Sequence, residues 1–215
     1  MAADLKYHYI AVEGPIGVGK TTLAQALSKK LGATLLMEDL QNPFLRDFYA
    51  GRKGAAFQCQ LFFLLTRYQQ QQQLVQRSLF DSRLVADYVP RKDKIFAYIN
   101  LDDSELILYE KLYALLMASV PKPDVVIYLQ ATTPVLLKRI HGRNRDYESK
   151  ISDEYVEELN KAYNYFFFHY QETPLLIVNT NDVDFEKDPS ELEHLIAQVN
   201  RLESGVLFYA PLGSA

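Results

Sequence analysis

Five short apolar runs punctuate the chain, and longer segments with helical periodicity separate them. The runs cover residues 7–13, 33–38, 83–87, 124–130 and 174–179. Several are nearly continuous in Val, Ile and Leu, which is typical of strands buried on both faces of a parallel sheet. The helical segments cover roughly residues 20–31, 42–50, 54–78, 101–119, 132–141, 152–170 and 188–203. This alternation predicts a three-layer α/β domain with a five-stranded parallel sheet flanked by helices.

The composition narrows the class of protein without indicating a function. The 215 residues carry a formal net charge of -4, so no global charge favours nucleic acid or an anionic membrane. No linker or change of composition divides residues 1–215, which predicts a single domain. The N-terminal residues lack the apolar core of a signal peptide, and no apolar run is long enough to span a bilayer. We therefore expect a cytoplasmic protein.

Residues 12–23, VEGPIGVGKTTL, contain the phosphate-binding loop pattern Gly14-x-x-x-x-Gly19-Lys20-Thr21 between an apolar run and a helical segment. The glycines of such a loop let several N–H groups point at phosphate oxygens, the lysine reaches the outer phosphates, and the hydroxyl binds Mg²⁺. The pattern predicts a P-loop NTPase fold that binds a nucleotide. The expected phosphate-binding residues are Gly14, Pro15, Ile16, Gly17, Val18, Gly19, Lys20, Thr21 and Thr22.

Two acidic residues end predicted strands. Glu38 closes the run 33–38, and Asp87 closes the run 83–87. Ligands of open α/β sheets gather beyond the carboxyl ends of the strands, so both acids are expected beside the phosphate loop. We predict that Asp87 supports Mg²⁺ together with Thr21, and that Glu38 takes a proton from an attacking hydroxyl.

Gln60 and Arg67 are seven positions apart in the helical segment 54–78, so they share one helix face. Their neighbours are nearly all apolar. A glutamine carboxamide offers one donor and one acceptor in a plane, which matches the edge of a nucleobase, and Arg67 either buttresses it or contacts the base itself. The alternative is a core glutamine beside an arginine of a surface ion pair.

Three arginines, Arg139, Arg143 and Arg145, crowd into seven residues at the end of the segment 132–141 and just beyond it. A basic run is usually a solvated face. In a protein that binds phosphate, arginines on a flap can close over a triphosphate and stabilise charge on the transferred phosphoryl group. We therefore predict an arginine-rich lid over about residues 139–150.

Taken together, these residues make the chain resemble the deoxynucleoside kinases, most closely their bacterial deoxyadenosine/deoxyguanosine kinase branch. The resemblance covers nearly the whole chain. It rests on GPIGVGKTT (14–22), Glu38 followed by NPFLRDFY (42–49), QLFFLLTR (60–67), VADY with KIFA (85–97) and an arginine flap that ends in Glu148. It implies ATP as the phosphate donor, Mg²⁺, a deoxynucleoside whose 5′-hydroxyl accepts the phosphoryl group, and a homodimer.

The resemblance also implies roles for individual residues. Glu38 resembles the general base, and Asp87 the acid associated with Mg²⁺. The sugar 3′-hydroxyl is expected between Tyr49 and Glu148, and the base against Gln60 and Arg67. The arginines are expected to form the closing lid, and the loop around Asp184 and Phe185 to hold the adenine of ATP.

One position departs from the family pattern. Many relatives place an arginine directly after the acid that corresponds to Asp87, but here the residue is Tyr88. Either Arg91 reaches back to the region that this arginine contacts in relatives, or the lid arginines make that contact instead. An acid that contacts the base in relatives is matched by Asp93, although the segment is one residue shorter here. The residue at position 88 and the match of Asp93 both affect which base the enzyme is expected to prefer.

Two alternatives to a deoxynucleoside kinase stay open from the sequence. A nucleoside monophosphate kinase, such as a thymidylate kinase relative, shares the loop and lid but needs an extra basic site for the acceptor phosphate. A nucleotide-binding regulatory module would hydrolyse ATP slowly with no acceptor. Within the leading interpretation, the resemblance favours purines, with deoxyadenosine ahead of deoxyguanosine and deoxycytidine as a further alternative.

Overall fold

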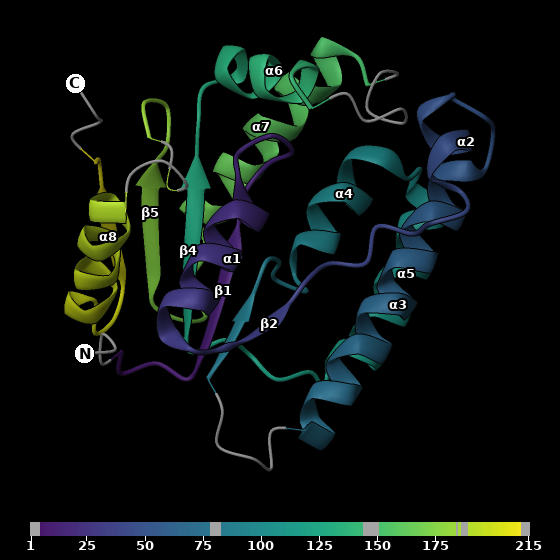
Figure 1. Cartoon of the computed structure of the whole chain (residues 1–215). Helices are drawn as coiled ribbons and strands as arrows, with labels where there is room; N and C mark the ends of the chain where they lie inside the picture. The colour runs from purple at the N-terminus through teal and green to yellow at the C-terminus, as the bar shows by residue number, and fades with distance from the viewer. Residues whose placement is uncertain (1–4, 78–82, 144–150, 184, 186–188, 212–215) are drawn as a thin grey trace.

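The computed structural model describes residues 5–77, 83–143, 151–183, 185 and 189–211. Its centre is a sheet of six parallel strands in the order β2-β3-β1-β4-β5-β6 (Figure 1). The strands are β1 (Tyr9–Glu13), β2 (Thr34–Leu36), β3 (Leu84–Ala86), β4 (Val125–Gln130), β5 (Leu175–Asn179) and β6 (Val206–Tyr209). Because β1 lies between β3 and β4, the loop that follows β1 emerges near the middle of the sheet.

Helices cover both faces of this sheet, which gives the predicted three-layer arrangement (Figure 1). They are α1 (Lys20–Leu31), α2 (Leu45–Tyr49), α3 (Ala55–Arg77), α4 (Lys92–Asn100), α5 (Asp103–Met117), α6 (Thr133–His141), α7 (Asp153–Phe168) and α8 (Pro189–Arg201). In the part of the chain that the structure describes, no helix is both long and apolar enough to cross a membrane.

The two faces of β1 build two separate cores, because successive side chains of a strand point to opposite sides. Ile10 and Val12 pack into a core shared with α1 and α8. Tyr9 and Ala11 pack into a second core, to which α7 contributes aromatic residues such as Tyr163. A smaller third cluster joins α3, α4 and α5. Burial on both faces explains why the central strands are nearly continuous in apolar residues.

The α/β prediction is confirmed, but the predicted number of strands is wrong. The sixth strand, β6, pairs in parallel with β5 at the edge of the sheet, and its residues alternate between exposed and half-buried. Its four residues, VLFY, are all apolar, so the sequence carried a strand signal at this position that the prediction did not use. The helix α4 was also missed, since its nine residues begin two positions after Pro90 and carry a charged first turn.

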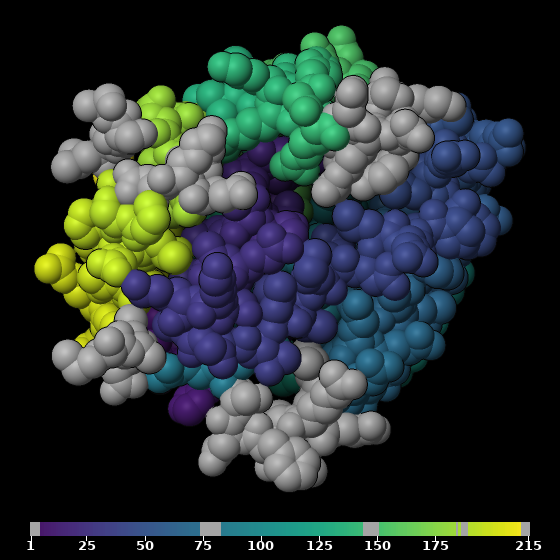
Figure 2. All heavy atoms as spheres, in the orientation of Figure 1, coloured from purple at the N-terminus to yellow at the C-terminus, as the bar shows by residue number. Residues whose placement is uncertain are grey.

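The space-filling view places the phosphate loop and α1, drawn in purple, at the centre of one face of the molecule (Figure 2). The C-terminal segments, in yellow, lie on one side of α1, and blue residues of the first third of the chain lie on the other. The carboxyl ends of β1, β2 and β3 therefore meet beside α2 and α3, and the candidate site lies there.

Candidate active site

A cavity of about 340 Å³ opens between the phosphate loop and the helices α2 and α3. Its lining includes predicted residues from both halves of the site. These are Ile16, Gly17, Gly19, Lys20, Thr21, Thr22, Glu38, Tyr49, Gln60, Arg67, Asp87 and Arg143. Phosphate-binding residues and the candidate base-reading residues therefore face one open cavity, as an enzyme with two substrates requires.

The phosphate loop adopts the backbone that its glycines permit. Gly17 has φ of 90° and Gly19 has φ of 104°, a region that side chains disfavour. A Cβ added at Gly17 would also lie 2.9 Å from the carbonyl oxygen of Leu136. Lys20 begins α1, so the positive end of the helix dipole faces the loop. These features suit a bound phosphate.

Lys20 folds back over the loop, where its ammonium donates to the carbonyl oxygens of Gly14 at 2.6 Å and Pro15 at 3.2 Å. Burial lowers the pKa of Lys20 to about 8, although Glu13 opposes this shift. The side chain is thus a cation held next to the phosphate cradle, with carbonyl contacts that phosphate oxygens can replace.

Thr21 and Asp87 are directly linked, as the predicted metal site requires. The Thr21 hydroxyl donates to Asp87 Oδ2 at 2.9 Å, and Asp87 is nearly fully buried just after β3. The other oxygen, Oδ1, accepts from the backbone N–H of Glu38 at 2.6 Å. Hydroxyl and carboxylate oxygens beside a phosphate loop suit Mg²⁺, which prefers one or two protein ligands plus phosphate and water. The residues present therefore fit this ion.

Glu38 lies two residues beyond β2 and is clamped by two cations. Its Oε1 accepts from Arg67, and its Oε2 accepts from the ammonium of Lys92. Burial alone raises the pKa of this carboxyl, but the ion pairs with Lys92 and Arg67 outweigh burial and hold the pKa below its ordinary value. Glu38 is therefore an ionised carboxylate that accepts hydrogen bonds at the cavity wall.

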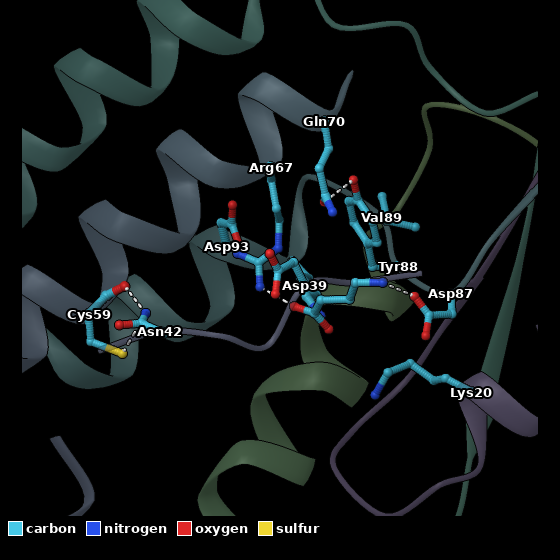
Figure 3. A network of polar contacts seen from close by, with 12 residues as sticks. Lys20, Asp39, Asn42, Cys59, Arg67, Gln70, Asp87, Tyr88, Val89 and Asp93 are labelled. Atoms are coloured by element: carbon cyan, nitrogen blue, oxygen red, sulfur yellow. Dashed lines mark hydrogen bonds and ion pairs between the residues drawn. The ribbon is translucent and has the colours of Figure 1, made fainter. Parts of the chain in front are cut away.

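Arg67 is shared by two carboxylates. One terminal nitrogen, Nη2, donates to Glu38, and the other, Nη1, donates to Asp93. The ring of Phe63 lies 4.7 Å from the guanidinium carbon, so an aromatic face supports the group as well. Figure 3 shows Arg67 and Asp93 side by side, with Asp87 and Lys20 on the other side of the same network. These contacts make Arg67 a support for Glu38 and Asp93.

Gln60 shares the cavity wall with Arg67, and the predicted common helix face is confirmed on α3. Its side chain is 3% exposed. Among the described residues, no group forms a hydrogen bond with the Gln60 carboxamide. Since Gln60 lines the cavity, its carboxamide can form hydrogen bonds with a ligand there.

The predicted arginine lid is described only in part. Arg139 lies within α6, where its guanidinium donates to the carbonyl oxygens of Val18 at 3.2 Å and Thr180 at 2.6 Å. Arg143 follows α6 and lines the cavity. Arg145, Glu148 and Asp184 lie outside the described residues. Phe185 is buried in the core shared with α1 and α8.

The structure shows the surroundings of Tyr88, the residue that stands where many relatives have arginine. Tyr88 is fully buried, and its hydroxyl accepts from Gln71 and donates to Gln70, both at 3.1 Å. Arg91 does not line the large cavity, because it forms an ion pair with Glu172. The cation beside Glu38 comes instead from Lys92, which the sequence analysis did not identify. Its position in the charged run RKDK (91–94) gave no signal of burial.

A second residue missed from the sequence is Glu13, at the end of β1. It is fully buried and accepts from the N–H groups of Gly14 at 2.8 Å and Val89 at 2.9 Å, and from the Tyr163 hydroxyl at 3.3 Å. Burial raises its pKa, while Lys92 and the backbone N–H groups oppose the rise. Glu13 therefore ties the phosphate loop to the segment that carries Asp87.

The fold and site together define a P-loop kinase, and comparison with known proteins names the family. The model of the deoxynucleoside kinase family matches residues 10–203. Deoxyguanosine kinase of Bacillus subtilis is 39% identical over 90% of this chain and 97% of its own length. Deoxyadenosine kinase of Dictyostelium discoideum is 36% identical over 90% of this chain and 79% of its own length.

Solved structures agree with this assignment. The structure of deoxyadenosine kinase from M. mycoides with bound dATP aligns with a TM-score of 0.74 at 30% identity, over 89% of this chain and 98% of that chain. The chain belongs to the deoxynucleoside kinase family. It is an ATP-dependent enzyme of that family, and the two alternatives that the sequence left open are not favoured.

Proposed function

We propose that the enzyme transfers the γ-phosphoryl group of ATP to the 5′-hydroxyl of a purine deoxynucleoside. The observation that carries this proposal is the cavity of about 340 Å³, which joins a phosphate loop to a carboxylate and to an amide that has no hydrogen-bond partner among the described residues. Relatives named for deoxyguanosine and for deoxyadenosine support a purine. We keep deoxyadenosine ahead of deoxyguanosine as the order to be tested.

The donor half of the reaction requires charge neutralisation more than covalent chemistry. Lys20 and the N-terminus of α1 would hold the outer phosphates, and Arg143 faces the same cavity. Thr21 and Asp87 would hold Mg²⁺, which when bound supplies further positive charge to the phosphates. Arg139 would keep the phosphate loop in shape through its contact with Val18.

The acceptor half requires that the 5′-hydroxyl meet the γ-phosphate in line. Glu38 is the carboxylate we assign as general base, since it lines the cavity between the phosphate loop and Gln60. Its low pKa suits an acceptor that takes the proton late, as the new oxygen–phosphorus bond forms. Tyr49 also lines the cavity, and with Glu148 it would hold the 3′-hydroxyl.

The activity is tested by incubating the protein with ATP and each of the four deoxynucleosides and four ribonucleosides, and by measuring nucleoside monophosphate. We expect deoxyadenosine and deoxyguanosine to be phosphorylated best. Release of inorganic phosphate without any monophosphate would refute the proposal, because it would identify an ATPase instead.

The role of Glu38 has its own test. Glu38→Gln keeps the shape of the side chain but cannot accept the proton, so kcat should fall by about 10²–10⁴-fold with a modest change in KM. Thermal unfolding and ATP titration would check that the variant is folded. Turnover near that of the wild type would contradict the assignment.

We also propose that the enzyme is a cytoplasmic homodimer. Support comes from apolar side chains left exposed on three adjacent helices, α4, α5 and α7: Tyr98, Ile107, Leu108, Leu115, Tyr165 and Phe168. Unpartnered apolar surface of this kind is typical of a protein interface. Sedimentation equilibrium should give twice the chain mass of 24.7 kDa, and the mass of one chain would refute the dimer.

A further inference from the structure

Lys92 is a buried cation at the wall of the large cavity. It begins α4, its side chain is nearly inaccessible to solvent, and its ammonium donates to Glu38 Oε2. The electrostatic neighbours of Lys92 include Glu13 and Lys20, so it lies between the donor and acceptor halves of the site. Burying an ammonium is costly, and a structural filler at this position would be apolar.

Neutralising Glu38 does not explain the presence of Lys92. Arg67 already pairs with the other oxygen of Glu38, and two cations on one carboxylate weaken it as a base. Lys92 also offsets the charge of the buried Glu13, and its ammonium remains available to a further negative charge in the cavity. The phosphoryl group and the attacking oxygen develop such a charge in this cavity during transfer.

Geometry places the acceptor oxygen beside Lys92. A hydroxyl that donates its proton to Glu38 Oε2 must lie within hydrogen-bonding distance of that atom. Lys92 already contacts the same oxygen atom, and an ammonium has three N–H groups, of which one is directed to Glu38. The hydroxyl oxygen bound to Oε2 is therefore a near neighbour of the remaining N–H groups.

Two other cations near Lys92 are already held by carboxylates. Arg91 is held by Glu172 outside the large cavity, and the guanidinium of Arg67 is held by Glu38 and Asp93. Tyr88 supplies no charge, but its ring lies 5.9 Å from the Lys92 nitrogen and gives the ammonium an aromatic wall.

We propose that Lys92 is a catalytic residue that donates a hydrogen bond to the 5′-oxygen of the acceptor while phosphoryl transfer proceeds. This inference rests on the proposed function. In the step, a bond forms between the 5′-oxygen and the γ-phosphorus, and the bond from that phosphorus to the β–γ bridging oxygen breaks. ADP leaves, Glu38 receives the hydroxyl proton, and Lys92 keeps all of its own protons.

The test compares Lys92→Met, Lys92→Arg and the matched control Lys94→Met, with ATP and the best deoxynucleoside found for the wild type. Lys94 lies two residues further along α4, does not line the cavity, and has its ammonium over the ring of Tyr113. Steady-state kinetics, calorimetric binding of the deoxynucleoside and thermal unfolding are measured on each protein.

We expect Lys92→Met to lower kcat by about 10²–10³-fold, the usual effect of removing one donor to a developing oxyanion. The dissociation constant of the deoxynucleoside should change little, because the interaction strengthens only in the transition state. Lys92→Arg should recover at least a tenth of wild-type kcat, since it keeps a cation with N–H donors. Lys94→Met should match the wild type.

Several outcomes would overturn the inference. One is a folded Lys92→Met enzyme with wild-type kcat, and another is a loss confined to KM, which marks a binding role. A Lys92→Arg variant that is folded yet as inactive as Lys92→Met would also refute it. If Lys92→Met does not fold, Lys92→Gln takes its place, because glutamine keeps a hydrogen bond to Glu38. A folded Lys92→Gln enzyme with wild-type kcat, or with a loss confined to KM, would then overturn the inference. Absence of kinase activity in the wild type refutes the proposed function itself, and this inference with it.

Discussion

Replacing Gln60 by alanine is a direct test of base recognition, because this side chain has no hydrogen-bond partner among the described residues. Its carboxamide is buried at the cavity wall, and no described residue forms a hydrogen bond with it. The substitution therefore leaves no protein group unsatisfied. We expect the stability of Gln60→Ala to stay close to that of the wild type, since no hydrogen bond to a described residue is broken.

The catalytic efficiency of Gln60→Ala, unlike its stability, should fall strongly. A carboxamide can pair with one donor and one acceptor on the base, and each group left unpaired costs about 1–3 kcal/mol. The expected loss in kcat/KM is about 2–4 kcal/mol, or roughly 30-fold to 900-fold at 1.36 kcal/mol for each factor of ten. The loss should be largest for the base that the wild type prefers.

The assay is monophosphate formation from each deoxynucleoside by the wild type, Gln60→Ala and the control Gln58→Ala. Gln58 is exposed and lies on the same helix two residues away, so its substitution should change neither rate nor stability. An unchanged ranking of the deoxynucleosides by Gln60→Ala would show that another residue recognises the base. An equal loss of kcat/KM in Gln58→Ala would show that the effect comes from a disturbance of the helix α3 and not from base recognition.

Two further predictions concern other parts of the fold. Ser152 caps α7 by accepting from the N–H of Tyr155 at 3.2 Å, so Ser152→Ala should lower the free energy of unfolding in urea by about 0.5–2 kcal/mol. Thr132→Ala is the control, because the Thr132 side chain makes no capping bond at α6; an equal loss there would refute the capping argument. Burial raises the pKa of Cys59 to about 12, so only a small fraction of this thiol is thiolate at pH 8. A disulfide reagent at pH 8 should therefore label Cys59 about 10³-fold more slowly than a free thiol, and the labelling rate should increase as the pH rises. Labelling of the native protein at the rate of a free thiol would contradict this.

The parts of the fold that the sequence predicted are those with a strong local signal. The phosphate loop needs glycine at positions such as Gly17, where the backbone has positive φ and no room for a Cβ. Gln60 and Arg67 were placed on one face because helix geometry fixes the direction of residues seven apart. The strands buried on both faces stood out as apolar runs. In each case the physical cause acts over a few neighbouring residues.

The parts that were missed depend on contacts between distant segments. Lys92 and Glu38 are 54 residues apart, and the charged run around Lys92 resembles a solvated surface until α4 is packed against the sheet. Glu13 precedes the phosphate loop and looks like an ordinary strand end, yet it accepts hydrogen bonds from Val89 and Tyr163. Tertiary packing alone turns these residues into parts of the site.

Arg67 connects base recognition to phosphoryl transfer. The sequence left open whether Arg67 contacts the base or supports Gln60, and in the free protein its two terminal nitrogens are directed to Glu38 and Asp93. A base that fits poorly against Gln60 and displaces Arg67 must also displace Glu38, because a guanidinium is planar and rigid. Misplacing a general base lowers kcat as well as affinity. We therefore expect deoxynucleosides with poorly fitting bases to have both a lower kcat and a higher KM. If only KM varied among the deoxynucleosides, base recognition and phosphoryl transfer would be independent.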